Sequence, residues 1–149
     1  RFIKAIHSIK IKELFEARCV LEEGFVQIAA KKANSQDISQ IKSYIDDAEK
    51  NINDKNEFVY LEFKFHHYIF EIADNKVLSA VMNSLNELLL VLEKYEKDYL
   101  DISDRALSLQ QHTGIYNAIK EKDPEKARAA MHVHLETMES RLKKMEIQE

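Results

Sequence analysis

At 149 residues the chain has the usual size of one domain, and its two glycines and one proline leave little material for hairpins or loops. Its formal net charge of −4, with both signs mixed, gives no broad basic face for nucleic acid. No apolar run approaches the roughly 18 residues of a membrane span, and a single cysteine rules out an intramolecular disulfide. Composition therefore predicts one soluble helical domain in a reducing, cytoplasmic compartment.

The first half of the chain predicts three helices. Apolar residues recur at three- and four-residue steps between about 9 and 33, which indicates a long amphipathic helix. Asn34 offers cap chemistry for a second helix. Asp54 and Glu57 have the spacing of a capping box, so a third helix is expected to begin there and to run to about Ala73.

The second half predicts three more helices. The strongest periodicity, over residues 77–92, indicates a helix whose apolar face serves the core or a dimer interface, and we expect the core. Asp101 or Ser103 can cap the next helix, and Asp123 with Pro124 has the pattern of an N-cap followed by a first helical residue. Short connections favour antiparallel neighbours, so the predicted fold is all-α, an antiparallel bundle of about six helices.

Four side chains of the types that commonly bind metals fall on the apolar faces of three predicted helices. Glu62 and His66 stand four residues apart and therefore share one face. A buried carboxylate is costly unless it is protonated, paired or bound to a metal. His112 and His134 lie on the inward stripes of the last two helices. Imidazole and carboxylate donors suit zinc, and also nickel, manganese, cobalt or iron, so the four residues are candidate ligands of a divalent metal.

Spacing alone leaves a plainer interpretation open, because it does not show that the three helices converge. Each histidine can instead be a core residue held by hydrogen bonds. His67 and His132 lie about 100° round their helices from the candidate ligands, so we expect them to be solvated. His7 lies near the start of the chain, and we expect it to belong to a linker.

Three segments of the chain carry a family pattern, and together they extend over nearly its whole length: LFEARCVLEEGFVQIAAKKA, FKFHHYIFEIADNKVL and QHTGIYNAIKEKDPEKARAAMHVHLETM. Glu62 directly precedes the middle segment, and it is followed by His66 four residues later and by Asn75 nine residues after that. In the last segment His112 and His134 are 22 residues apart. With these spacings the chain resembles the C-terminal effector-binding domain, called FCD, of the FadR branch of GntR-type bacterial transcription regulators.

The resemblance implies an all-helical sensor domain in which one aspartate and three histidines hold a divalent metal, with a small organic acid at or beside it. Here Glu62 stands where aspartate is usual, and glutamate is one methylene longer. Arg18 matches an arginine that in some relatives pairs with an effector carboxylate. The other interpretation of Arg18 is a surface ion pair with Glu22, four residues on.

In the family a DNA-binding winged helix precedes this domain. We therefore expect residues 1–8 to be the remnant of a linker from a missing N-terminal domain, and residues 9–149 to be the domain that binds effector and metal. The expected partners are a small carboxylate effector, a second copy in a homodimer, and DNA only through the missing domain. We expect no enzyme, because no HExxH motif and no paired Glu-x-x-His motifs occur. A metal-dependent enzyme and a ligand-free dimerisation module are the alternatives.

Overall fold

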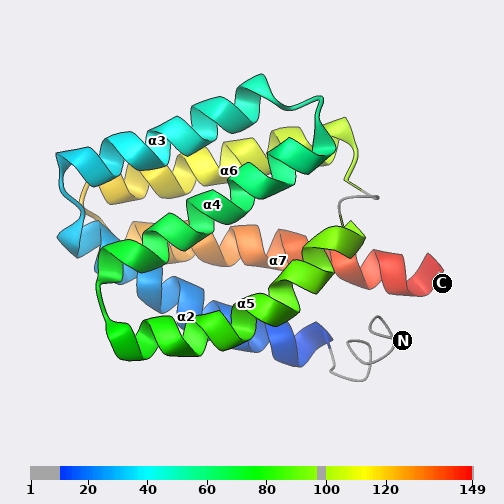
Figure 1. The fold of residues 1–149 in the computed structure, drawn as a ribbon, viewed down its shortest axis with the longest axis horizontal. Helices are drawn as coiled ribbons and strands as arrows, with labels where there is room; N and C mark the ends of the chain where they lie inside the picture. Colours follow the sequence, from blue (N-terminus) through cyan, green and yellow to red (C-terminus); the bar gives the residue numbers. More distant parts are fainter. Residues whose placement is uncertain (1–10, 97–99, 149) are drawn as a thin grey trace.

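The computed structural model describes residues 11–96 and 100–148, and these form six helices with no strand among them. The helices are α2 (Ile11–Lys32), α3 (Ser35–Lys50), α4 (Lys55–Ala73), α5 (Lys76–Glu96), α6 (Ile102–Lys120) and α7 (Pro124–Gln148). Successive helices alternate in direction along the bundle (Figure 1). The predicted all-α antiparallel bundle is thus confirmed, and the linker expected at residues 1–8 lies outside the described residues.

Reciprocal capping boxes mark where two of the helices begin. At the start of α3, the Asn34 side chain accepts a hydrogen bond from the Asp37 backbone N–H at 2.8 Å, and the Asp37 carboxylate accepts one from the Asn34 N–H at 3.0 Å. Asp101 and Asp104 form the same reciprocal box at the start of α6, so Asp101 rather than Ser103 is the N-cap. Each box satisfies N–H groups that have no partner within the first helical turn.

The main core lies between α2, α4, α6 and α7, with α3 packed against α4 and α6. Because α2 contacts α4, α6 and α7, it buries more than a single narrow stripe. The large side chains buried at the centre of these helices include Phe15, Phe25, Phe65, Ile115, Met131 and Leu135. The wide buried face of α2 also takes in two charged residues, Arg18 at 6% exposure and Glu22 at 0%.

Helix α5 is less buried than its periodicity suggests. Among residues 76–88, whose side chains the structure describes, only Met82 is buried. Leu85 packs against the core cluster, but Val77 is 74% exposed and Val81 is 46% exposed. The apolar repeat therefore splits between a stripe that faces the core and a stripe that faces outward, so the core accounts for only part of it.

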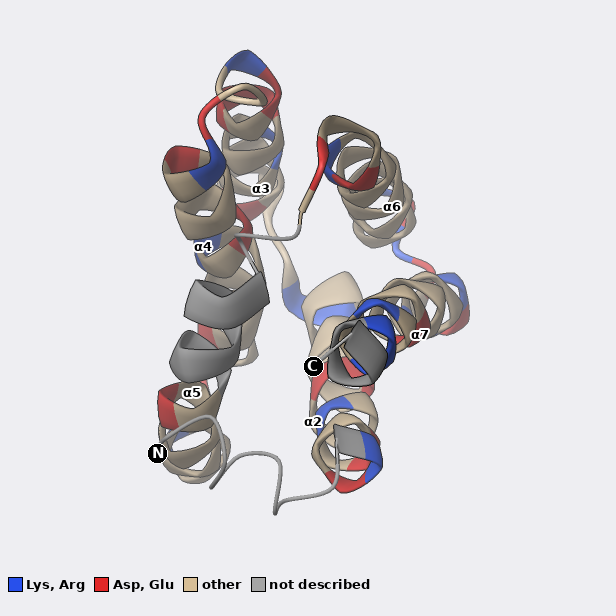
Figure 2. Cartoon of the chain, turned by 90° about the vertical axis from the view of Figure 1, so that its right-hand side faces the viewer, with Lys and Arg blue, Asp and Glu red and all other residues tan. Residues whose placement is uncertain are grey.

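Charged residues of both signs are interspersed along the helices (Figure 2). This distribution agrees with the mixed charge of the sequence and gives the described part of the chain no broad basic face. None of the helices in the described ranges combines the length and the apolarity that crossing a membrane requires.

Candidate metal and effector site

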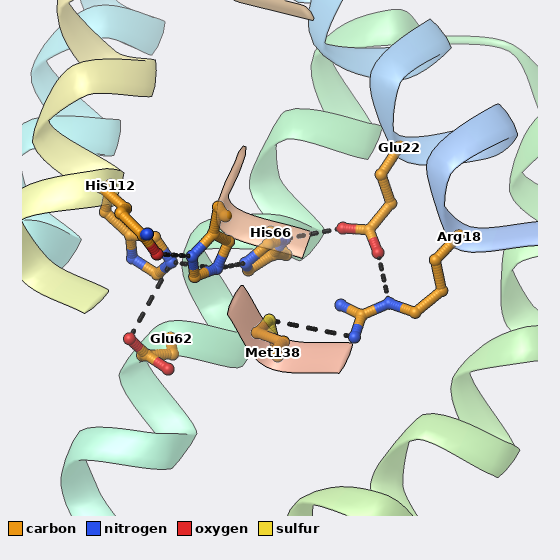
Figure 3. Close-up of polar contacts among 8 residues, drawn as sticks. Arg18, Glu22, Glu62, His66, His112 and Met138 are labelled. Carbon is orange, nitrogen blue, oxygen red and sulfur yellow. Dashed lines mark hydrogen bonds and ion pairs between the residues drawn. The ribbon is translucent and has the colours of Figure 1, made fainter. Parts of the chain in front are cut away.

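Three imidazoles from three helices converge inside the bundle. His66 on α4, His112 on α6 and His134 on α7 are all buried. The Nε2 atom of His134 lies 3.2 Å from that of His66 and 3.0 Å from that of His112. One ring nitrogen from each residue lies within 4.8 Å of the other two. Figure 3 shows His66 and His112 pointing toward the same volume from opposite sides.

Glu22 determines which nitrogen of His66 carries a proton. Its Oε1 atom lies 2.7 Å from His66 Nδ1, and its Oε2 accepts a hydrogen bond from Arg18 Nε at 2.7 Å (Figure 3). Burial raises the pKa of a carboxyl, but the charges of Arg18 and His66 and their hydrogen bonds outweigh it and lower the pKa of Glu22 to about 2. The ionised carboxylate can only accept, so His66 donates from Nδ1, and neutral His66 has its lone pair on Nε2.

A chain of hydrogen bonds determines, in the same way, which ring nitrogen of His134 carries a proton. Thr137 Oγ1 donates to the Val133 carbonyl at 3.0 Å, so it accepts from Gln111 Nε2 at 2.9 Å. The amide of Gln111 is thereby oriented with Oε1 toward His134 Nδ1, at 2.8 Å. His134 must donate from Nδ1, and its neutral form also has the lone pair on Nε2.

If His66 and His134 are both neutral, their Nε2 lone pairs face each other across 3.2 Å. Burial, followed by the neighbouring imidazoles, holds the pKa of His112 and His134 well below the usual value, so both are neutral at pH 7. Two facing lone pairs repel unless a proton or a metal ion lies between the two nitrogens. A divalent metal fits this arrangement, because metals bind the unprotonated nitrogen of a neutral imidazole whose other nitrogen donates to an acceptor.

Glu62 lies at the edge of the histidine cluster. Its Oε1 is 3.9 Å from His112 Nε2 (Figure 3). The donors that lie within 4.8 Å of one another are the three histidines, without Glu62. The geometry therefore brings the predicted carboxylate near one imidazole, and its ligation of a metal stays a prediction.

A small cavity of about 30 Å³ lies beside the cluster. Its lining includes Arg18 and Glu22 from α2, Glu62 and His66 from α4, Asn86 from α5, Leu100 and Met138. Arg18 is bound to Glu22 through Nε, and its Nη1 lies 3.9 Å from Met138 Sδ. The pair of Arg18 and Glu22 exists, but the surface location considered for it is wrong, because both side chains are buried beside the cavity.

The other histidines are less solvated than expected. His67 is partly buried and lines the same cavity. His132 is also partly buried, with Nδ1 3.0 Å from Glu23 Oε2 and Nε2 3.1 Å from Glu136 Oε1. The expectation of solvated side chains is met in part, because 37% of the His67 side chain and 44% of the His132 side chain are exposed. His7 lies outside the described residues.

The sequence interpretation missed the residues that orient the imidazoles. Glu22 follows Phe15 by seven residues and Arg18 by four, so a helical stripe through these positions already placed it on the inward face. Gln111 and Thr137 carry no comparable signal. Their role depends on contacts between α6 and α7 that only the fold brings about.

The protein-family model of the FCD domain matches residues 13–137 of the sequence. The chain belongs to the FCD family. This FCD domain is 26% identical over 132 residues to the HTH-type transcriptional repressor NanR of Cronobacter sakazakii, covering 89% of the chain and 51% of that protein. It is 28% identical over 140 residues to the uncharacterized HTH-type transcriptional regulator YcbG of Bacillus subtilis, covering 94% of the chain and 58% of the relative.

Two solved structures share the fold of this FCD domain. Escherichia coli McbR/YncC superposes with a TM-score of 0.83 at 15% identity, over 91% of the chain and 65% of that structure. Streptococcus agalactiae GntR superposes with a TM-score of 0.73 at 21% identity, over 87% of the chain and 58% of that structure. The chain spans about half the length of the curated relatives it matches. Both curated relatives are named as transcription regulators, in agreement with the expectation that the chain is no enzyme.

Proposed function

We propose that this FCD domain is the ligand-sensing part of a bacterial transcription factor of the FadR branch, and that it binds a divalent metal together with a small organic acid. The observation that carries the proposal is the convergence of three buried imidazoles, with one ring nitrogen from each of His66, His112 and His134 within 4.8 Å of the other two. Glu22 and Gln111 hold the Nδ1 atoms of His66 and His134, which leaves the Nε2 atoms directed into the cluster, as metal-bound imidazoles require.

The proposed ligands are His66, His112 and His134, with Glu62 as the carboxylate that reaches the metal through its longer side chain. Zinc suits three imidazoles best, and nickel, manganese, cobalt and iron are compatible with the same donors. A metal bound in this way supplies open coordination positions that an effector carboxylate can occupy.

Arg18 is the proposed second anchor for the effector. Glu22 holds the guanidinium through Nε, so the terminal nitrogens remain to pair with a carboxylate. The cavity of about 30 Å³ is small for an organic acid. In the proposal, effector binding widens the cavity by moving α5, which contributes Asn86 to the wall and buries only Met82 among residues 76–88.

This movement gives the domain a way to signal. A ligand shifts a conformational equilibrium only if it binds one arrangement better than the other, and an effector that requires a wider cavity meets that condition. In the proposal, residues 9–149 act in a cytoplasmic homodimer, residues 1–8 join each copy to an N-terminal winged helix, and the effector changes the spacing of the two winged helices on DNA. The exposed Val77 and Val81 offer α5 as part of the dimer interface.

The metal part of the proposal is tested by calorimetry. Untagged protein with Cys19→Ser is stripped with chelator and titrated with zinc. We expect one equivalent to bind to this protein and none to bind after His112→Ala and His134→Ala are added. Circular dichroism shows whether the fold is retained. A folded Cys19→Ser protein that binds no zinc would leave the ligand-free dimerisation module as the better account.

The effector part is tested by thermal shift with acetate, succinate and citrate as probes. We expect at least one probe to raise the melting temperature of the zinc-loaded protein and to have a much smaller effect on the zinc-free protein. Arg18→Gln should abolish the rise. Arg128→Gln is the matched control, because Arg128 also pairs with glutamates but does not line the cavity. An equal rise with and without zinc would contradict a metal-bound carboxylate.

A further inference from the structure

A second group of metal-binding side chains bridges α2 and α7. Cys19 and Glu23 stand four residues apart on α2, and His132 faces them from α7. One donor atom from each lies within 4.8 Å of the other two, and all three side chains are partly buried. Glu23 Oε2 lies 3.0 Å from His132 Nδ1. None of the three lines the cavity beside His66.

We propose that Cys19, Glu23 and His132 form a second metal site, selective for a thiophilic divalent ion such as zinc. A thiolate, a carboxylate and an imidazole are all common zinc ligands, and three protein donors leave a fourth tetrahedral position for water. The thiolate gives this site a different metal preference from the histidine cluster, because soft donors favour zinc and cobalt over manganese or magnesium.

Neighbouring residues already hold the atoms of these ligands that would not face the metal. His132 Nε2 lies 3.1 Å from Glu136 Oε1, the carboxylate–histidine contact that supports metal-bound imidazoles. Arg128 Nη1 donates to Glu23 Oε1 at 3.3 Å, which leaves Glu23 Oε2 toward His132. Contacts outside the triad therefore orient the carboxylate of Glu23 and the imidazole of His132.

Binding exchanges protons for metal without any redox change. In the metal-free protein, burial and the charge of Glu23 raise the pKa of Cys19 to about 11, so the thiol keeps its proton at neutral pH. When the ion binds, Cys19 Sγ and His132 Nδ1 release their protons to solvent, and bonds to sulfur, nitrogen and Glu23 Oε2 form. The thiolate and the carboxylate together balance the two positive charges of the ion.

Such an ion would tie α2 to α7 next to the proposed effector site. Arg18 directly precedes Cys19 on α2, and His134 lies two residues beyond His132 on α7. The second site rests on its own contacts, so it stands or falls independently of the histidine cluster.

Cobalt is the probe that separates the two sites. Thiolate-bound cobalt gives a sulfur-to-metal charge-transfer band in the near ultraviolet, and Cys19 is the only cysteine in the chain. Reduced, chelator-stripped protein is titrated with Co²⁺. We expect the band to saturate in the wild type, to persist in the His112→Ala, His134→Ala variant and to vanish in Cys19→Ser. His132→Gln should weaken cobalt binding at this band by at least about tenfold.

His67→Gln is the matched control, because His67 is also partly buried and also pairs with a glutamate four residues on, Glu71. It should leave the band unchanged. A wild-type protein without the band, or a band that His132→Gln does not weaken, would overturn the proposal. Alkylation gives a second measurement on the wild-type fold: zinc should slow the reaction of Cys19 with iodoacetamide, and an unchanged rate would also overturn it.

Discussion

At the scale of single residues, Glu22 links the two halves of the proposed site. One carboxylate oxygen accepts a hydrogen bond from Arg18, the proposed effector anchor. The other accepts one from His66, a proposed metal ligand. A fully buried carboxylate is stable only with such partners. Because both partners bind the same group, a change at Glu22 should disturb both the orientation of the imidazole and the position of the guanidinium.

Glu22→Gln should therefore destabilise the metal-free protein in a way that depends on pH. The pKa of Glu22 is lowered to about 2 from its usual value of 4.5, so its ionised form stabilises the fold above pH 4.5 and this stabilisation is lost as pH falls toward 2. The shift corresponds to about 3 kcal/mol in the free energy of unfolding at pH 7. Urea unfolding should show that the difference in this free energy between wild type and variant shrinks from pH 7 down to pH 3.

Glu23→Gln serves as the control, because the neighbouring glutamate is only partly buried and should give a smaller difference. If the free energies of unfolding of wild type and Glu22→Gln differ by the same amount at pH 7 and at pH 3, the Glu22 carboxylate is not held in its ionised form by Arg18 and His66.

The inward positions of the three histidines are predictable because one helix carries the information for each. His66, His112 and His134 lie on apolar stripes, and the structure brings all three together. Their role as metal ligands stays a prediction. The alternative interpretation of Arg18 and Glu22 as a surface ion pair fails because α2 packs against three other helices and buries more than one stripe. The position of Glu62 at the edge of the cluster depends on a side-chain conformation that no spacing encodes.

At the scale of helices, the boundaries follow from cap chemistry and were largely predictable. The capping box at Asn34 and the N-cap at Asp101 satisfy backbone groups locally, so residues close in sequence determine them. The burial of α5 was not predictable in this way. Its apolar residues are numerous enough for two faces, and only the packing of the other helices decides which face is covered.

Helix α5 should open more readily than α4. Only Met82 is buried among residues 76–88, whereas α4 buries seven residues, so local unfolding of α5 exposes less apolar surface. Hydrogen exchange of the ligand-free protein should show amides of 76–88 exchanging at least about tenfold faster than those in the middle of α4. Equal protection of the two helices would contradict the role of α5 as the movable wall of the cavity.

At the scale of the whole molecule, the bundle brings together groups that lie far apart in the chain. α2 contributes the guanidinium and its carboxylate, while α4, α6 and α7 each contribute one imidazole. Since the donors come from four helices, a metal and an effector bound there contact most of the core at once. A change in occupancy can therefore alter how the helices pack, as the proposed sensing function requires.

The central claim is that the three imidazoles bind one metal ion, and X-ray absorption of the zinc-loaded Cys19→Ser protein tests it most directly. The Cys19→Ser change removes the thiolate of the second site, so the spectrum reports the histidine cluster. We predict three imidazole ligands with one or two oxygen donors, and the loss of bound zinc in the His112→Ala, His134→Ala variant. A spectrum with fewer than two imidazoles, or zinc retained by that variant, would contradict the account.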